Sequence, residues 1–116
     1  MDLETVREYC LTLPNVTERV QWGNDLLFRI GDKMFAVACM DASYPNKLSF
    51  KCSPETFEEL TELEGVIPAP YLARAKWVSL LSWDAVPPDR LRALLRQAYD
   101  QVFAKLPKKV RTELAG

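Results

Sequence analysis

Histidine is absent from this sequence of 116 residues, and glycine and cysteine are scarce. Without histidine there is no imidazole base, no usual zinc ligand and no Ser-His or Cys-His nucleophile pair. The four glycines, at positions 23, 31, 65 and 116, are widely separated, so the chain has no glycine-rich phosphate loop. Because these absences exclude the commonest catalytic machinery, we expect a protein that is not an enzyme.

The three cysteines, Cys10, Cys39 and Cys52, form no CxxC pair. Three thiols cannot all pair with one another, so buried free thiols are expected, with one reactive thiol as the alternative. No apolar run approaches the ~18 residues of a membrane-spanning helix. The first residues also lack the basic and apolar regions of a signal peptide. The sequence therefore predicts a cytoplasmic location and no contact with membrane.

The composition, 48% hydrophobic and 27% charged, is that of an ordinary globular protein. A chain of this length forms one hydrophobic core, and no repeat, linker or low-complexity tract divides it. We expect a single domain over residues 1–116.

Residues 26–39 predict a β-hairpin whose two-residue loop is Gly31-Asp32. Glycine at the first loop position favours a type II′ turn, and counting from that turn places Phe28 opposite Phe35 and Leu26 opposite Val37. Alternation then directs one set of side chains to the core and the other set away from it. The predicted core set is Leu26, Phe28, Ile30, Phe35, Val37 and Cys39, and the outward set is Leu27, Arg29, Met34, Ala36 and Ala38.

The remaining elements follow from apolar periodicity, helix caps and turn formers. Helices are predicted over 3–13, 54–64 and 88–106, further strands over 16–22, 47–52 and 76–81, a stiff connector over 66–72 and one extra helical turn over 108–114. The order α-β-β-β-β-α-β-α predicts an α+β fold of two layers, in which helices pack on one face of an antiparallel sheet.

Several short motifs, in this order, resemble the MmcQ/YjbR family over roughly residues 3–111. They are WG at 22–23, GDKMF at 31–35, LSFK at 48–51, IPAP at 67–70, LARAKW at 72–77, AY at 98–99 and KLP at 105–107. The resemblance implies a frataxin-like (CyaY-like) fold and a largely uncharacterised family, described as DNA-binding because its sheet has been likened to a double-wing domain. Likeness of fold does not establish function. Many members have histidine where this chain has Lys76, so any chemistry of that histidine is lost here.

The leading functional hypothesis is DNA binding. Basic side chains attract phosphates, and an aromatic side chain beside them can stack on an exposed base. The net charge of −1 argues against this function, but the glutamates concentrate in residues 55–64 and leave the rest of the chain net basic. The candidate residues are Lys47, Lys51, Arg74, Lys76, Trp77, Lys108 and Lys109. The alternative interpretation is that these charges are merely solvated and that Trp77 belongs to the core.

A second hypothesis assigns function to the sheet face that the helices leave uncovered. This face is shallow and apolar enough for a planar small molecule or a partner protein. Its candidate residues are Trp22, Leu27, Arg29 and Met34. The alternatives are a dimer interface or a face covered by the connector over residues 68–74.

A frataxin-like fold can also carry an acidic ridge that binds iron. Glu55, Glu58, Glu59 and Glu62 share one face of a predicted helix, with the spacing that such a ridge requires. Acidic helix faces are usually only solvated, and the first helix offers few carboxylates. We therefore predict no metal site and no cofactor.

Overall fold

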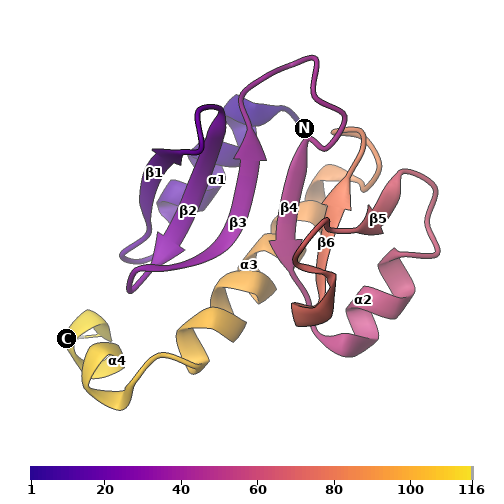
Figure 1. The fold of residues 1–116 in the computed structure, drawn as a ribbon. Helices are drawn as coiled ribbons and strands as arrows, with labels where there is room; N and C mark the ends of the chain where they lie inside the picture. The colour runs from indigo at the N-terminus through magenta and orange to yellow at the C-terminus, as the bar shows by residue number, and fades with distance from the viewer. Residues whose placement is uncertain (116) are drawn as a thin grey trace.

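The computed structural model describes residues 1–115 and confirms the predicted α+β class. Six antiparallel strands form one open sheet in the order β1-β2-β3-β4-β6-β5 (Figure 1). The strands are β1 (Thr17–Gln21), β2 (Asp25–Ile30), β3 (Lys33–Cys39), β4 (Leu48–Lys51), β5 (Val66–Pro68) and β6 (Trp77–Leu80). The helices are α1 (Leu3–Thr12), α2 (Pro54–Leu60), α3 (Pro88–Ala104) and α4 (Lys108–Ala115), with a short 3-10 turn, η1 (Ala73–Ala75), before β6.

The predicted order of elements is confirmed, and the structure adds the short elements β5 and η1 between α2 and β6. β5 lies at the edge of the sheet and pairs only with β6. The amide of Ala69 donates to the Trp77 carbonyl, so the nitrogen of the preceding Pro68 faces away from β6, where a missing N–H costs no ladder bond. The stiff connector predicted over 66–72 therefore begins as an edge strand. The extra turn predicted near the C-terminus is the full helix α4.

Local capping explains where α1 and α2 begin. The Asp2 carboxylate accepts a hydrogen bond of 2.8 Å from the Thr5 amide, and the Ser53 hydroxyl accepts one of 3.2 Å from the Thr56 amide. These side chains satisfy amides that a helix leaves free in its first turn. α2 ends at Leu60, earlier than predicted, and residues up to Gly65 continue as turns.

The hydrophobic core lies between one face of the sheet and the helices α1 and α3, which Figure 1 shows on the same side of the sheet. Phe28, Phe35 and Phe50 all point into this core and have no exposed surface. Tyr99 of α3 packs edge-on against Phe35, with ring centroids 5.7 Å apart, and donates to the Pro14 carbonyl at 2.7 Å. None of the helices in residues 1–115 is long and apolar enough to cross a membrane.

The hairpin of β2 and β3 departs from the predicted register. Its turn is Gly31-Asp32 as predicted, but both residues have positive φ (56° and 65°), which is typical of type I′ and not of the predicted type II′. Beyond the turn Arg29 pairs with Met34, whereas Phe28 pairs with Ala36. The residue between these partners, Phe35, is therefore the extra residue of a β-bulge in β3.

This bulge reverses the facing of the rest of β3. Phe35 and Ala36 are both fully buried in the core, and Ala38 joins them. Val37 and Cys39 face the opposite side of the sheet, where they line a groove. The prediction that Val37 and Cys39 belong to the core, and Ala36 and Ala38 to the outward face, was therefore wrong. A single inserted residue shifts every later side chain to the other face.

Candidate functional site

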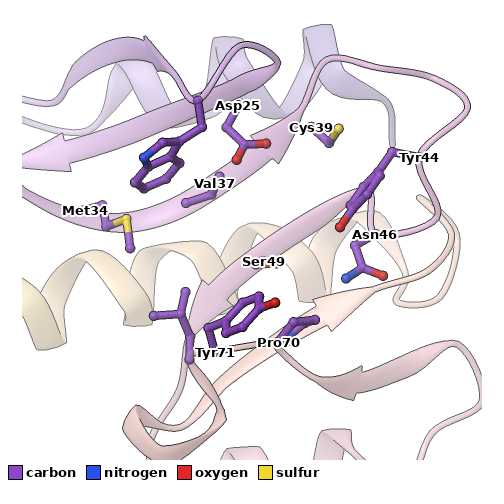
Figure 2. Close-up of a pocket in the computed structure, with 11 residues that line it drawn as sticks. Asp25, Met34, Val37, Cys39, Tyr44, Asn46, Ser49, Pro70 and Tyr71 are labelled. Carbon is purple, nitrogen blue, oxygen red and sulfur yellow. The ribbon is translucent and has the colours of Figure 1, made fainter.

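A groove of about 400 Å³ lies on the sheet face opposite the core (Figure 2). The side chains of Met34, Val37 and Ser49 from β3 and β4 form its floor. Three loops surround this floor: the β1–β2 turn, the loop between β3 and β4, and the connector between β5 and β6 (residues 69–76). Its size falls within the range of small-molecule sites. The lining residues are Trp22, Asp25, Met34, Val37, Cys39, Tyr44, Asn46, Ser49, Pro70, Tyr71 and Leu72.

Each of the three loops contributes one exposed aromatic side chain to the groove. The exposed fractions are 66% for Trp22, 49% for Tyr44 and 105% for Tyr71. In Figure 2, Tyr44 and Tyr71 come from different segments, with Asn46 and Ser49 between them. Aromatic rings offer a large apolar surface with defined geometry, and such surfaces favour contact with another flat group. The groove therefore combines an apolar floor with an aromatic rim.

Three bulky residues beside the two cavities have a left-handed backbone. Trp22, Tyr71 and Lys76 have φ values of 55°, 66° and 66°, in the left-handed region that bulky residues rarely adopt. The other such residues between positions 1 and 115, glycines aside, are Asn15 and Asp32, whose residue types tolerate this region. Trp22 and Tyr71 line the groove, and Lys76 lines a second cavity described below. Strain of this kind is found preferentially at functional sites.

Hydrogen bonds fix the loop that carries Tyr44 and Asn46. The Asp41 carboxylate accepts from the amide and the hydroxyl of Ser43, at 2.9 and 2.7 Å, and these bonds lower its pKa. The Lys47 ammonium donates to the carbonyls of Ala42 and Tyr44, at 2.8 and 2.9 Å. Lys47, predicted to contact phosphate, is thus engaged in holding the loop against the groove.

Few polar groups line the groove. Partial burial raises the pKa of Asp25, because desolvation disfavours its charged form. The hydroxyl of Ser49 lies 2.6 Å from that of Ser79, which is fully buried, so each satisfies the other. Asp25 and Asn46 can still bond to a ligand, which gives the groove a small number of orienting groups in an apolar setting.

A second cavity, here called the basic pocket, has a volume of about 560 Å³. Its cationic side chains are Lys51 of β4, Arg74 and Lys76 of the connector, and Lys105 at the end of α3. The Lys51 ammonium donates to the Ala75 carbonyl at 3.1 Å, and its pKa is lowered by burial and then by the nearby Lys105 charge. The Lys76 ammonium lies 5.0 Å from the centroid of the Phe57 ring, a cation-π contact. Within residues 1–115, none of the four cations is in an ion pair.

The comparisons with known proteins agree with the motifs. The model of the YjbR family matches residues 11–101, most of the chain. The chain belongs to the YjbR family. The crystal structure of protein DR2400 from Deinococcus radiodurans, with family-model domain DUF419, is similar at 30% identity and a TM-score of 0.87, over 98% of this chain and 88% of that one. These matches confirm the resemblance drawn from the sequence.

A protein from Pseudomonas syringae, solved by the Northeast Structural Genomics Consortium, shares the fold at 16% identity and a TM-score of 0.70. That match covers 87% of this chain and 98% of that one. No curated protein matched the chain. The likeness to frataxin is not tested by these matches and stays a prediction.

In this YjbR protein, Lys51, Arg74 and Lys76 of the predicted DNA contacts lie together in the basic pocket, joined by Lys105. Trp77 is only 4% exposed, and its amide donates to the Leu72 carbonyl of the connector at 3.2 Å. Trp77 is therefore not available to stack on a base.

Lys108 and Lys109 are exposed on α4, which packs near the β2–β3 turn and not at the basic pocket. A methyl group added at Gly31 would lie 2.8 Å from the Leu106 side chain and 3.3 Å from that of Val110. The predicted cationic residues thus divide between three places on the YjbR fold: the loop beside the groove, the basic pocket and α4.

Of the residues proposed for the uncovered face, Trp22 and Met34 line the groove. Leu27 lies opposite Val37 but is only 4% exposed, and it does not reach the groove. Arg29 does not line the groove either, and its buried Nε atom has no hydrogen-bond partner within the described residues. The connector borders this face, where Pro70, Tyr71 and Leu72 line one side of the groove.

Sequence reasoning missed the aromatic rim formed by Tyr44 and Tyr71. Each stands beside a proline, in Tyr44-Pro45 and Pro70-Tyr71, within a run of turn formers. A large aromatic residue in such a loop has no place in a strand or helix pattern. This signal could have marked both residues as candidates for a surface site.

Proposed function

We propose that this YjbR protein is a non-enzymatic binding protein that holds the flat aromatic part of a ligand in the groove of its uncovered sheet face. The observation that carries this proposal is the ring of three exposed aromatic side chains around an apolar floor. A planar ligand would stack on the aromatic faces, and Asp25 and Asn46 would orient its polar edge. The proposal of binding without catalysis rests on the absence of histidine from the chain.

The dimensions favour a small ligand over a partner protein. A stable protein interface buries about 800 Å² on each side and is usually flat. The groove is concave, holds about 400 Å³ and is closed on several sides by loops. A small planar molecule would fill this volume, whereas a protein partner would contact mainly the rim.

Titration of the isotope-labelled protein with adenosine and with 2-naphthol tests this proposal. We expect NMR shifts at the Trp22 indole N–H and at the amides of Met34 and Val37, because these groups line the groove. Trp22→Ala should weaken binding about tenfold, because it removes one stacked ring. Leu11→Ala, which removes an exposed apolar side chain of α1, is the matched control. If no groove signal moves with either probe at millimolar concentration, the proposal fails.

DNA binding is the second candidate function. The basic pocket favours it, because its four cations have no ion pair among the described residues and are free to bind phosphates. The buried Trp77 and the distant Lys108 and Lys109 do not add to this cluster. Fluorescence anisotropy with labelled duplex and single-stranded DNA checks the candidate. Absence of binding to both at ~50 mM salt, where phosphate contacts are strong, would remove it.

A further inference from the structure

We infer that the groove's ligand carries a phosphate and is a nucleotide unit, with its base on the aromatic rim and its phosphate in the basic pocket. This inference rests on the proposed function of the groove and names the class of ligand. It is carried by the position of the two cavities relative to each other and by the complementary chemistry of their linings.

The basic pocket adjoins the groove at the end of β4, where it lies between the connector and the C-terminal end of α3. Ser49 lines the groove and Lys51 lines the basic pocket, and both side chains point from the same face of β4. Two residues along a strand span ~7 Å. The connector also serves both cavities, because Pro70–Leu72 border the groove and Arg74–Lys76 border the basic pocket. A ligand with an aromatic part and an anionic part can therefore occupy both cavities at once.

The charges around the basic pocket are not neutralised by the protein. Among the described residues, no carboxylate lines this cavity. Asp100, next to the lining residue Gln101 in sequence, is paired with Arg96 at 3.2 Å. Glu55 follows the lining residue Pro54 and is exposed to solvent. Cations held together without a counter-charge repel one another, and a bound phosphate would relieve that repulsion.

The cations are also of the types, and in the positions, that suit a phosphate. Arg74 can bond to two phosphate oxygens at once, while the lysines act as point charges. Lys76 is held in place by the hydrogen bond that its backbone amide donates to the Ala73 carbonyl, at 2.9 Å, and by the contact of its ammonium with the Phe57 ring. Its left-handed backbone, at a φ of 66°, is the C-cap that ends η1.

Base and phosphate together describe a free nucleotide or one unit of a single-stranded nucleic acid. The probes are therefore adenosine, inorganic phosphate, adenosine 5′-monophosphate and a short oligothymidylate, each titrated into the full-length protein by calorimetry and NMR. We expect the monophosphate to bind at least about tenfold more tightly than adenosine, because a phosphate gains charge-assisted bonds. The last two probes distinguish a free nucleotide from a nucleic-acid strand. Much tighter binding of the oligothymidylate than of the monophosphate indicates a strand, and equal affinities indicate a free nucleotide.

The double variant Lys51→Gln/Lys105→Gln should remove the advantage of the monophosphate and leave adenosine binding unchanged. Lys108→Gln/Lys109→Gln is the matched control, because it removes the same charge from α4, outside the basic pocket. If the first variant does not fold, Arg74→Gln at an exposed position of η1 replaces it.

The outcomes separate the inference from the proposed function. If adenosine binds the groove and the monophosphate binds no more tightly, the inference is wrong and the proposed function stands. If the monophosphate binds but the Trp22 indole signal does not move, the base does not occupy the groove and the inference is also wrong. If neither compound moves a groove signal, both the inference and the proposed function fail.

Discussion

At the scale of single residues, three bulky residues that line the two cavities have a left-handed backbone: Trp22, Tyr71 and Lys76. An L-residue in this conformation costs roughly 1–2 kcal/mol. Trp22 and Tyr71 are largely exposed, so packing does little to offset that cost. Strained residues that line a cavity are typical of a trade-off, in which stability is lost for the sake of function.

Tyr71→Gly tests this trade-off. Glycine adopts positive φ without strain, and the fully exposed Tyr71 side chain has little packing to lose. We expect the free energy of unfolding in urea to rise by about 1 kcal/mol and the affinity for adenosine to fall. A decrease in stability would mean that Tyr71 packs against the sheet and that its backbone carries no strain.

Asp25 gives a second prediction at this scale, from the sign of its pKa shift. Burial raises the pKa of Asp25 above its usual 3.8, because the folded protein favours the neutral carboxyl over the charged one. The stability that this gives is full below the unfolded pKa and is lost as pH rises through the folded pKa. Asp25→Asn should therefore raise the melting temperature at pH 7 and bring no gain near pH 3. The control has the opposite sign: bonds from Ser43 lower the pKa of Asp41, so Asp41→Asn should lower the melting temperature at pH 7. Thermal melts at both pH values check both changes.

At the scale of elements, the β-bulge at Phe35 decides which side chains reach the groove. It places Val37 and Cys39 on the open face and leaves Ala36 and Ala38 in the core. With a regular hairpin, the larger side chains of Val37 and Cys39 would have filled the core instead. The groove floor therefore depends on one inserted residue.

Charged substitutions at adjacent positions test the facing of β3. Ala36→Asp should prevent folding, because it would bury a carboxylate without a partner at a cost of several kcal/mol. Val37→Asp should fold, because its side chain faces the groove, and should abolish the shifts that adenosine causes. Circular dichroism and thermal melts distinguish the two. If Ala36→Asp folded and Val37→Asp did not, β3 would have the facing of a regular hairpin without the bulge.

The elements were largely predictable from sequence because their signals are local. Asp2 and the Ser53-Pro54 pair mark helix starts by satisfying nearby amides, and the structure has the caps where they were expected. The facing of β3 was not predictable, since both of its phases are apolar: Met34, Ala36 and Ala38 alternate with Phe35, Val37 and Cys39. Hydrophobicity alone could not locate the extra residue. β5 was missed because two prolines in three residues normally argue against a strand.

At the scale of the whole molecule, the net charge of −1 conceals a strong local separation. The glutamates gather along α2 and the turns after it, whereas Lys51, Arg74, Lys76 and Lys105 converge on the basic pocket. The candidate site as a whole was beyond sequence reasoning because loops supply most of it. Periodicity orients side chains within a strand, but it does not bring a turn at Trp22 next to a connector at Tyr71.

The salt dependence of oligothymidylate binding measures which cations bind phosphates. Each phosphate that a cation neutralises adds roughly 0.7 to the slope of log affinity against log salt for a single strand. Lys51→Gln/Lys105→Gln should reduce the slope by that amount for each phosphate that these two lysines neutralise. Lys108→Gln/Lys109→Gln should leave the slope unchanged. The reverse result would locate the binding surface on α4.

The edge strand β5 has a consequence for how molecules of this protein meet in a crowded solution. The Val66 amide already bonds to the Leu63 carbonyl at 3.2 Å, and Pro68 has no amide hydrogen. β5 therefore presents no free N–H donor to an approaching strand, which disfavours extension of the sheet there by a neighbouring chain. The opposite edge, β1, carries Glu18 and Arg19, whose charges also discourage such stacking. The same prolines that hid this strand in the sequence thus protect the protein against amyloid-like assembly.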